Sequence, residues 1–133
     1  MKIYTSYFSK GKKLTDAGIK MIGIALKPPT WYYGGTVHDV APTPSILYGA
    51  QTEEEYTRRF KAEVLSRVNA RAFVDKITQM SQGHDVALCC FEKPGEFCHR
   101  HIVAEWLKEQ LGIEVDEYGV SKQPQPIQLD LFG

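Results

Sequence analysis

The sequence predicts an α/β fold, a three-layer sandwich with a mainly parallel sheet, followed by a flexible C-terminal tail. Residues 85–91 are almost wholly apolar, as in a strand that is covered on both faces. A helical pattern follows them and ends at Gly112, and residues 113–118 can form a further strand. A strand, a helix and a strand in this order form a βαβ unit, the building block of parallel sheets.

The N-terminal part adds two strands and a long loop. Residues 1–8 mix β-branched and aromatic side chains in near alternation, and residues 21–26 are a short apolar run, so both are expected to be strands. Residues 28–51 keep no period and are rich in Pro, Gly and aromatic side chains. They predict a loop, and loops of this length in a compact domain tend to be functional.

A helix is predicted directly after this loop. Thr52 and Glu55 have the spacing of a capping box, so the helix begins after Thr52. Its apolar positions, which include Tyr56 and Phe60, share one face as far as Val68. The helix is therefore expected to bury that face in the core.

Two more helices are marked by capping residues. Asn69 can cap a helix that ends before Gly83. The helix of the βαβ unit has Ile102 and Trp106 on its apolar face and ends at Gly112. Together these elements place one domain at residues 1–118, which suits a chain of 133 residues.

The composition excludes several classes of protein. With 43% hydrophobic and 24% charged residues and no long apolar run, the chain is expected to be globular and not bound to a membrane. The N-terminus lacks the apolar stretch of a secretory signal, which predicts a cytoplasmic protein. The three cysteines do not fit a disulfide framework, so reduced thiols are expected.

The formal net charge of zero argues against nonspecific binding to nucleic acid. The charges are nevertheless uneven, because residues 1–40 hold six Lys and two Asp, whereas residues 101–133 hold two Lys and six acids. This polarity permits an anionic ligand without requiring one.

The segment between the buried strand and the next helix carries the densest chemistry. Cys98 is expected in the first turn of the helix, where the dipole lowers a thiol pKa and favours a bound anion. We therefore hypothesise a catalytic centre with Cys98 as nucleophile or redox thiol and Cys90 as resolving thiol. In the same centre His99 is the acid/base group and Glu92 an orienting carboxylate.

Other interpretations of these residues remain open. Cys90 can simply be a core residue, because free cysteines are commonly buried. No cofactor is expected, and the alternative is a zinc site made of Cys90, Cys98, His99 and Glu92. Seven residues between the two cysteines match no common zinc spacing.

Several residues are candidates for binding a ligand. Arg100 has a forked guanidinium suited to phosphate or carboxylate, and His101 is its neighbour. Trp31 can stack on a base, although such aromatic residues more often pack a loop onto its own domain. Arg59 is free to meet a phosphate if Tyr56 and Phe60 face the core.

Residues 85–101 also resemble the signature of the bacterial and phage "domain of unknown function 488" family, and residues 4–8 and 27–32 resemble its short-chain branch. The resemblance covers residues 1 to about 118, and it implies a cytosolic α/β domain without an established activity. Residues 21–27 lack the Asp-Val-Arg motif of the commoner members. The matching positions are Cys90, Glu92, Pro94, Cys98, His99 and Arg100.

Residues 119–133 are predicted to be a linker and a partner-binding tail. The polar segment 119–127 leads to an apolar cluster that the linker cannot bury. The end of the chain resembles the motif by which bacterial proteins bind the DNA sliding clamp. Its four matching residues are Gln128, Leu129, Leu131 and Phe132. The alternative is a tail that docks on its own domain.

The sequence thus predicts a cytosolic α/β protein that acts in DNA replication, repair or modification through the sliding clamp. Its strand-to-helix segment would hold an anionic ligand, such as a phosphate, a nucleotide or nucleic acid, and can perform thiol chemistry. The competing hypothesis is a non-enzymatic adaptor or inhibitor that binds the clamp and another protein or a nucleotide.

Overall fold

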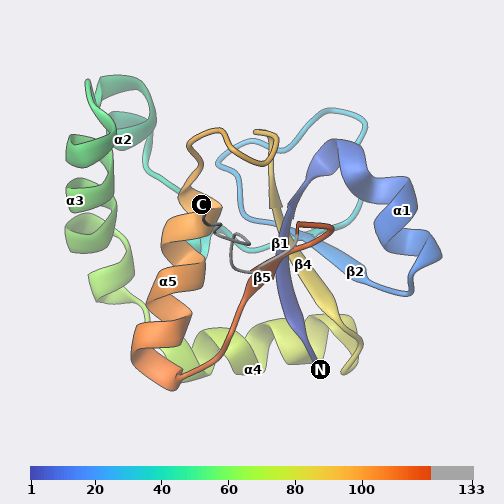
Figure 1. Cartoon of the computed structure of the whole chain (residues 1–133). Helices are drawn as coiled ribbons and strands as arrows, with labels where there is room; N and C mark the ends of the chain where they lie inside the picture. Colours follow the sequence, from blue (N-terminus) through green and yellow to red (C-terminus); the bar gives the residue numbers. More distant parts are fainter. Residues whose placement is uncertain (121–133) are drawn as a thin grey trace, which may run out of the picture.

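A five-stranded parallel sheet forms the centre of the structure, a computed structural model that describes residues 1–120 (Figure 1). The order of the strands is β3-β2-β4-β1-β5, and every pair is parallel. This confirms the predicted α/β class. The strands are β1 (Ile3–Tyr7), β2 (Lys20–Gly23), β3 (Gly35–Thr36), β4 (Val86–Cys90) and β5 (Asp116–Glu117).

The middle strand, β4, is the predicted apolar strand, and all five of its residues are buried. It pairs with β1 on one side and with β2 on the other. The register places Cys90 beside Tyr7 and Cys89 beside Gly23. Because parallel strands end at the same edge, the carboxyl ends of β1, β2 and β4 meet where Cys90 lies.

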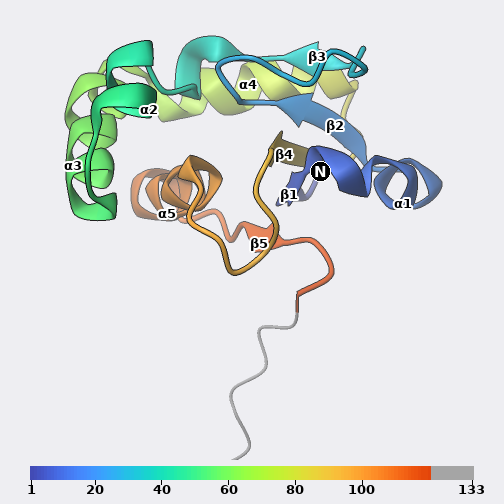
Figure 2. The same cartoon turned by 90° about the horizontal axis from the view of Figure 1, so that it is seen from above.

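Helices cover both faces of the sheet, as predicted, but unequally (Figure 2). On one face lie α4 (Ala70–Ser81) and α5 (His99–Leu111), with α3 (Glu53–Glu63) packed against α5. The opposite face carries only the short α1 (Gly11–Asp16) among the helices of residues 1–120. None of these helices combines the length and the apolar character that a membrane crossing requires.

The two faces of the sheet bury separate sets of side chains, because neighbouring residues of a strand point to opposite sides. Leu88 faces the large core under α4 and α5, together with Phe60 and Phe73. Ala87 and Cys89 face the smaller core under α1.

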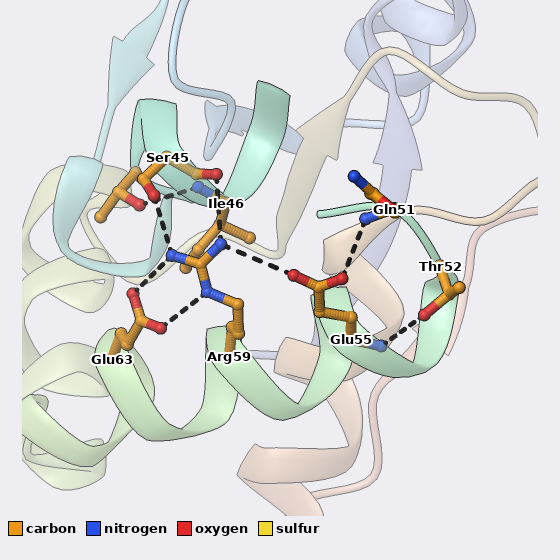
Figure 3. Close-up of polar contacts among 8 residues, drawn as sticks. Ser45, Ile46, Gln51, Thr52, Glu55, Arg59 and Glu63 are labelled. Atoms are coloured by element: carbon orange, nitrogen blue, oxygen red, sulfur yellow. Dashed lines mark hydrogen bonds and ion pairs between the residues drawn. The ribbon is translucent and has the colours of Figure 1, made fainter. Parts of the chain in front are cut away.

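The predicted capping residues begin their helices in the structure. Thr52 Oγ1 accepts a hydrogen bond of 2.9 Å from the backbone N–H of Glu55, and α3 follows (Figure 3). Asn69 Oδ1 accepts one of 2.9 Å from the N–H of Ala72 at the start of α4. Gly112 ends α5 with a left-handed backbone, φ 69°.

The structure corrects the expected long loop at residues 28–51. Within it lies α2 (Pro44–Gly49), capped by Thr43, whose side chain accepts a hydrogen bond of 3.2 Å from the N–H of Ile46. The helix forms because Ile46 is fully buried in the large core. The predicted helix to Val68 is also shorter, since α3 gives way to a 3-10 turn at Leu65–Arg67.

Strand β4 generates a test of the fold. Leu88→Ala removes a fully buried side chain from the centre of the sheet, and we expect a loss of about 2–5 kcal/mol in the free energy of unfolding. The same change at Leu47, which is 41% exposed, is expected to cost less than about 1 kcal/mol. Urea denaturation measures both, and equal losses would contradict the placement of β4.

Candidate functional site

A pocket of about 400 Å³ opens at the carboxyl edge of the sheet, beside the predicted strand-to-helix segment. It lies where β2 and β4 end and α5 begins, the usual position of ligands in open parallel sheets. Its walls are mainly apolar and aromatic, with a few polar groups, as in small-molecule sites. The lining residues are Ala25, Leu26, Lys27, Pro42, Leu47, Tyr48, Tyr56, Cys90, Phe91, Glu92, Phe97, Cys98 and His99.

Two of the predicted site residues, Cys90 and Cys98, are joined by a disulfide at the pocket. This corrects the expectation that all thiols are reduced. Cys90 is the last residue of β4, and Cys98 is the N-cap of α5, so the chain returns from the strand to bring the sulfurs together. The third cysteine, Cys89, is free and buried.

His99 lies beside the disulfide with a fixed orientation. Its Nε2 is 2.7 Å from the carbonyl oxygen of Ile24, which can only accept, so Nε2 carries the proton in the neutral ring. Its Nδ1 is then the lone-pair nitrogen, 3.8 Å from Cys98 Sγ. Burial, assisted by the charge of Arg100, lowers the pKa of His99 to about 4. His99 is therefore neutral at pH 7 and suited to accept a hydrogen bond from a thiol.

Arg100 is fully buried, and the protein itself engages its guanidinium. Nε and Nη2 donate to the two carboxylate oxygens of Glu117, each at 3.0 Å, and Nη1 donates to Cys90 Sγ at 3.2 Å. Thr5 Oγ1 donates a further hydrogen bond of 2.7 Å to Glu117. The guanidinium is thus occupied by Glu117 and Cys90, and Arg100 does not line the pocket.

Polar groups also surround the mouth of the pocket. Glu92 lines the pocket and is exposed. Burial, and then the charge of Glu92, raise the pKa of Tyr56 above its usual range. Lys27, four residues after the end of β2, also lines the pocket and is exposed.

The structure adds pocket residues that sequence reasoning missed. Tyr48 comes from α2, which was expected to be loop, and Phe97 precedes the helix start. The Phe97 ring makes an edge contact with Tyr56, with the ring centroids 5.1 Å apart. The local signal was present only for α2, in the Thr43-Pro44 start that favours a helix N-terminus.

The other three predicted ligand residues, like Arg100, do not line the pocket. Trp31 is 56% exposed, and His101 is half-buried, with its pKa lowered chiefly by burial. Arg59 is held within its own helix layer, with hydrogen bonds of 2.8 Å to Glu63 and to Ser45 (Figure 3). These contacts hold Arg59 between α2 and α3, away from the pocket lining. The tail residues Gln128, Leu129, Leu131 and Phe132 lie outside the described residues.

The zinc alternative has a partial counterpart in the structure. One donor atom from each of Cys90, Cys98 and His99 lies within 4.8 Å of the others. Glu92 is not a member of this group. While the disulfide is formed, the two sulfurs cannot serve as thiolate ligands.

Comparison with known proteins gave one family. A family model described as the active DUF488-N3 subclade, DUF488-N3a, matches residues 17–111. The match spans the disulfide, His99 and the whole of α5. No curated protein and no solved structure matched the chain.

The ion pair behind the site gives a test of its rigidity. Glu117→Gln leaves the fully buried Arg100 without its counter-charge, and we expect a loss of about 3–5 kcal/mol in the free energy of unfolding. The control is Glu114→Gln, in the exposed pair with Lys108, where the loss is expected to be under about 1 kcal/mol. Similar losses in urea denaturation would show that the Arg100 pair is not buried in solution.

Proposed function

The chain belongs to the DUF488 family, and on that premise we propose that it is a thiol–disulfide redox enzyme acting on a ligand in the pocket beside Cys90 and Cys98. The observation that carries the proposal is the disulfide itself, which borders a ligand-sized pocket with His99 at its side. We expect the protein in the cytoplasm, where disulfides are mostly transient and serve catalysis or redox sensing.

The proposed reaction is an exchange of disulfides. In the reduced state the Cys98 thiolate attacks one sulfur of a substrate disulfide, and the other sulfur leaves as a thiolate. The Cys90 thiolate then attacks Cys98 Sγ and releases the second substrate thiolate. Two electrons pass to the substrate, both released thiolates take up protons from water, and the Cys90–Cys98 disulfide forms.

The surroundings support different parts for the two cysteines. Cys98 caps the N-terminus of a 13-residue helix, whose dipole stabilises a thiolate, and the neutral His99 Nδ1 can accept its thiol hydrogen. Cys90 receives a hydrogen bond from Arg100, which favours its thiolate for the resolving step. Both assignments follow the roles that the sequence predicts.

The pocket supports an anionic, ring-bearing ligand as substrate. Tyr48, Phe91 and Phe97 offer aromatic walls, and Lys27 supplies a positive charge at the mouth. A nucleotide-like molecule that carries a disulfide bond combines the ring, the negative charge and the reactive group. Glu92 at the same mouth would orient it by repelling its anionic end from one side.

We further propose that the tail brings this domain to DNA through the bacterial sliding clamp. The support is the sequence of residues 128–132, and tethering raises the effective concentration at DNA without a basic surface. A non-enzymatic adaptor or inhibitor would use the same tail. The two hypotheses differ in whether the cysteine pair is reactive.

An aromatic, dianionic disulfide, 5,5′-dithiobis(2-nitrobenzoate), tests the reaction. Reduced, folded wild-type chain is expected to release two thionitrobenzoate anions per chain and to end with an internal disulfide, because the resolving step completes the exchange. Cys90→Ser is expected to release one and to remain as a mixed disulfide. Absorbance and intact mass measure both outcomes.

The matched control for this experiment is Cys89→Ala, which alters the neighbouring, buried thiol and is expected to behave as wild type. Lys27→Gln is expected to slow the reaction with the anionic disulfide more than that with neutral 2-hydroxyethyl disulfide. If the reduced wild type reacts no faster than a free thiol at pH 6.5, the redox proposal is wrong and the adaptor hypothesis gains.

Clamp recruitment is tested by titrating purified sliding clamp with the intact chain and with a Leu131→Ala, Phe132→Ala double variant. We expect binding by the intact chain and loss of binding by the variant, since these apolar side chains would fill the partner's pocket. Calorimetry measures the affinity. Equal binding by both chains, or no binding by either, would refute recruitment through this motif.

A further inference from the structure

We propose that Cys90, Cys98 and His99 form a binding site for one divalent transition-metal ion, such as Zn²⁺, when the disulfide is reduced. The inference depends on the proposed function only because it requires the cysteine pair to be reducible. Four observations carry it: the positions of the donor atoms, the spacing of the two cysteines, the tautomer of His99 and the charges around the sulfurs.

The donor atoms lie close enough for one ion to bind all three after the disulfide is opened. Both sulfurs and a nitrogen of His99 fall within 4.8 Å of one another, and Nδ1 is 3.8 Å from Cys98 Sγ. Around a tetrahedral zinc ion, Zn–S and Zn–N bonds of about 2.3 and 2.0 Å place ligand atoms about 3.5–3.8 Å apart. Cleavage of the S–S bond and a small separation of the sulfurs would complete this arrangement.

The spacing of the backbone agrees with an ion between the sulfurs. The Cα atoms of Cys90 and Cys98 are 7.4 Å apart, whereas disulfides usually span about 4.4–6.8 Å. A metal ion inserted between two thiolates increases the distance between the sulfurs, so it suits a wider pair. The anchoring elements, the end of β4 and the start of α5, therefore need little movement.

His99 is arranged as a metal-binding histidine. Ring nitrogens that bind metals usually belong to histidines whose other N–H donates to a carbonyl or carboxylate. His99 Nε2–H donates to the Ile24 carbonyl at 2.7 Å, which leaves the Nδ1 lone pair directed toward Cys98. The hydrogen bond thus fixes both the tautomer and the direction of the ring.

The charges around the sulfurs also favour a divalent cation. All three ligands are buried, with Cys90 1%, Cys98 3% and His99 5% exposed, and two buried thiolates would repel each other. A divalent ion with two thiolates has no net charge, and the adjacent Arg100–Glu117 pair is also neutral. Arg100 Nη1 would remain a donor to the Cys90 sulfur, which is the usual support of a metal-bound thiolate.

Three protein ligands leave one tetrahedral position, and all three residues line the 400 Å³ pocket. Sites with three protein ligands and one open position are typical of catalytic zinc, whereas structural zinc has four protein ligands. The open position would therefore take water or a donor atom of the pocket's ligand. Only the reduced chain would bind the ion and so offer this open coordination position to a ligand.

The test compares the two redox states of the full chain. The disulfide is reduced without oxygen by a water-soluble phosphine, which becomes phosphine oxide by taking oxygen from water, and the reagent is removed. We expect the reduced chain to bind one Co²⁺ with thiolate-to-cobalt charge-transfer and tetrahedral d–d absorption, and Zn²⁺ to displace it. The disulfide form is expected to bind neither ion.

Variants identify the ligands. Cys90→Ser, Cys98→Ser and His99→Gln are each expected to weaken binding by more than the roughly 10–100-fold that loss of a supporting hydrogen bond costs. Cys89→Ala is the matched control and is expected to keep the full spectrum, since Cys89 lies outside the donor group.

The reduced wild type decides the proposal even if a variant fails to fold. Thiol titration first establishes that the pair is reduced; if it cannot be reduced, the proposed redox function and this site both fail. If the pair is reduced and the chain binds no stoichiometric Co²⁺ or Zn²⁺, the metal site alone is refuted. Binding that persists in Cys89→Ala and disappears in the ligand variants supports it.

Discussion

The buried guanidinium of Arg100 is the interaction on which the arrangement of the site depends. From α5 it reaches Glu117 on the edge strand β5 and Cys90 at the end of the central strand, while Thr5 of β1 holds the same carboxylate. A charge in this position has no access to water, so each partner must stay in place to balance it. The side chain of Arg100 therefore fixes the start of α5, the strands β4 and β5 and the Cys90 sulfur relative to one another.

Local signals in the sequence predicted most of the fold. The apolar run of β4 and the caps Thr52 and Asn69 act over a few residues, and the structure confirms them. The short helix α2 was missed because six residues are too few to show a helical period. It forms through the burial of Ile46 against distant parts of the chain, which no local pattern records.

The sequence indicated the edge of the sheet where the candidate site lies, but not the contacts between its residues. A strand followed by a helix identifies the edge where Cys98 and His99 lie, because parallel sheets bind ligands there. The partner of Arg100 could not be predicted, since Glu117 belongs to a two-residue strand whose pairing depends on the whole sheet. The contribution of Tyr48 to the pocket wall was also not predicted, because Tyr48 belongs to α2, a helix that the sequence did not indicate.

The two neighbouring cysteines of β4 also differ in whether they can take part in disulfide exchange. Cys89 and Cys90 are adjacent in the chain and belong to the same core cluster, yet Cys90 is bonded to Cys98 and lines the pocket, whereas Cys89 is free and does not line it. Burial raises the pKa of Cys89 to about 12, so it is not a thiolate at neutral pH. Thiol scrambling needs a thiolate that can reach the disulfide, and the folded chain offers none from Cys89. At neutral pH the protonated Cys89 therefore does not exchange with the Cys90–Cys98 disulfide of the folded chain.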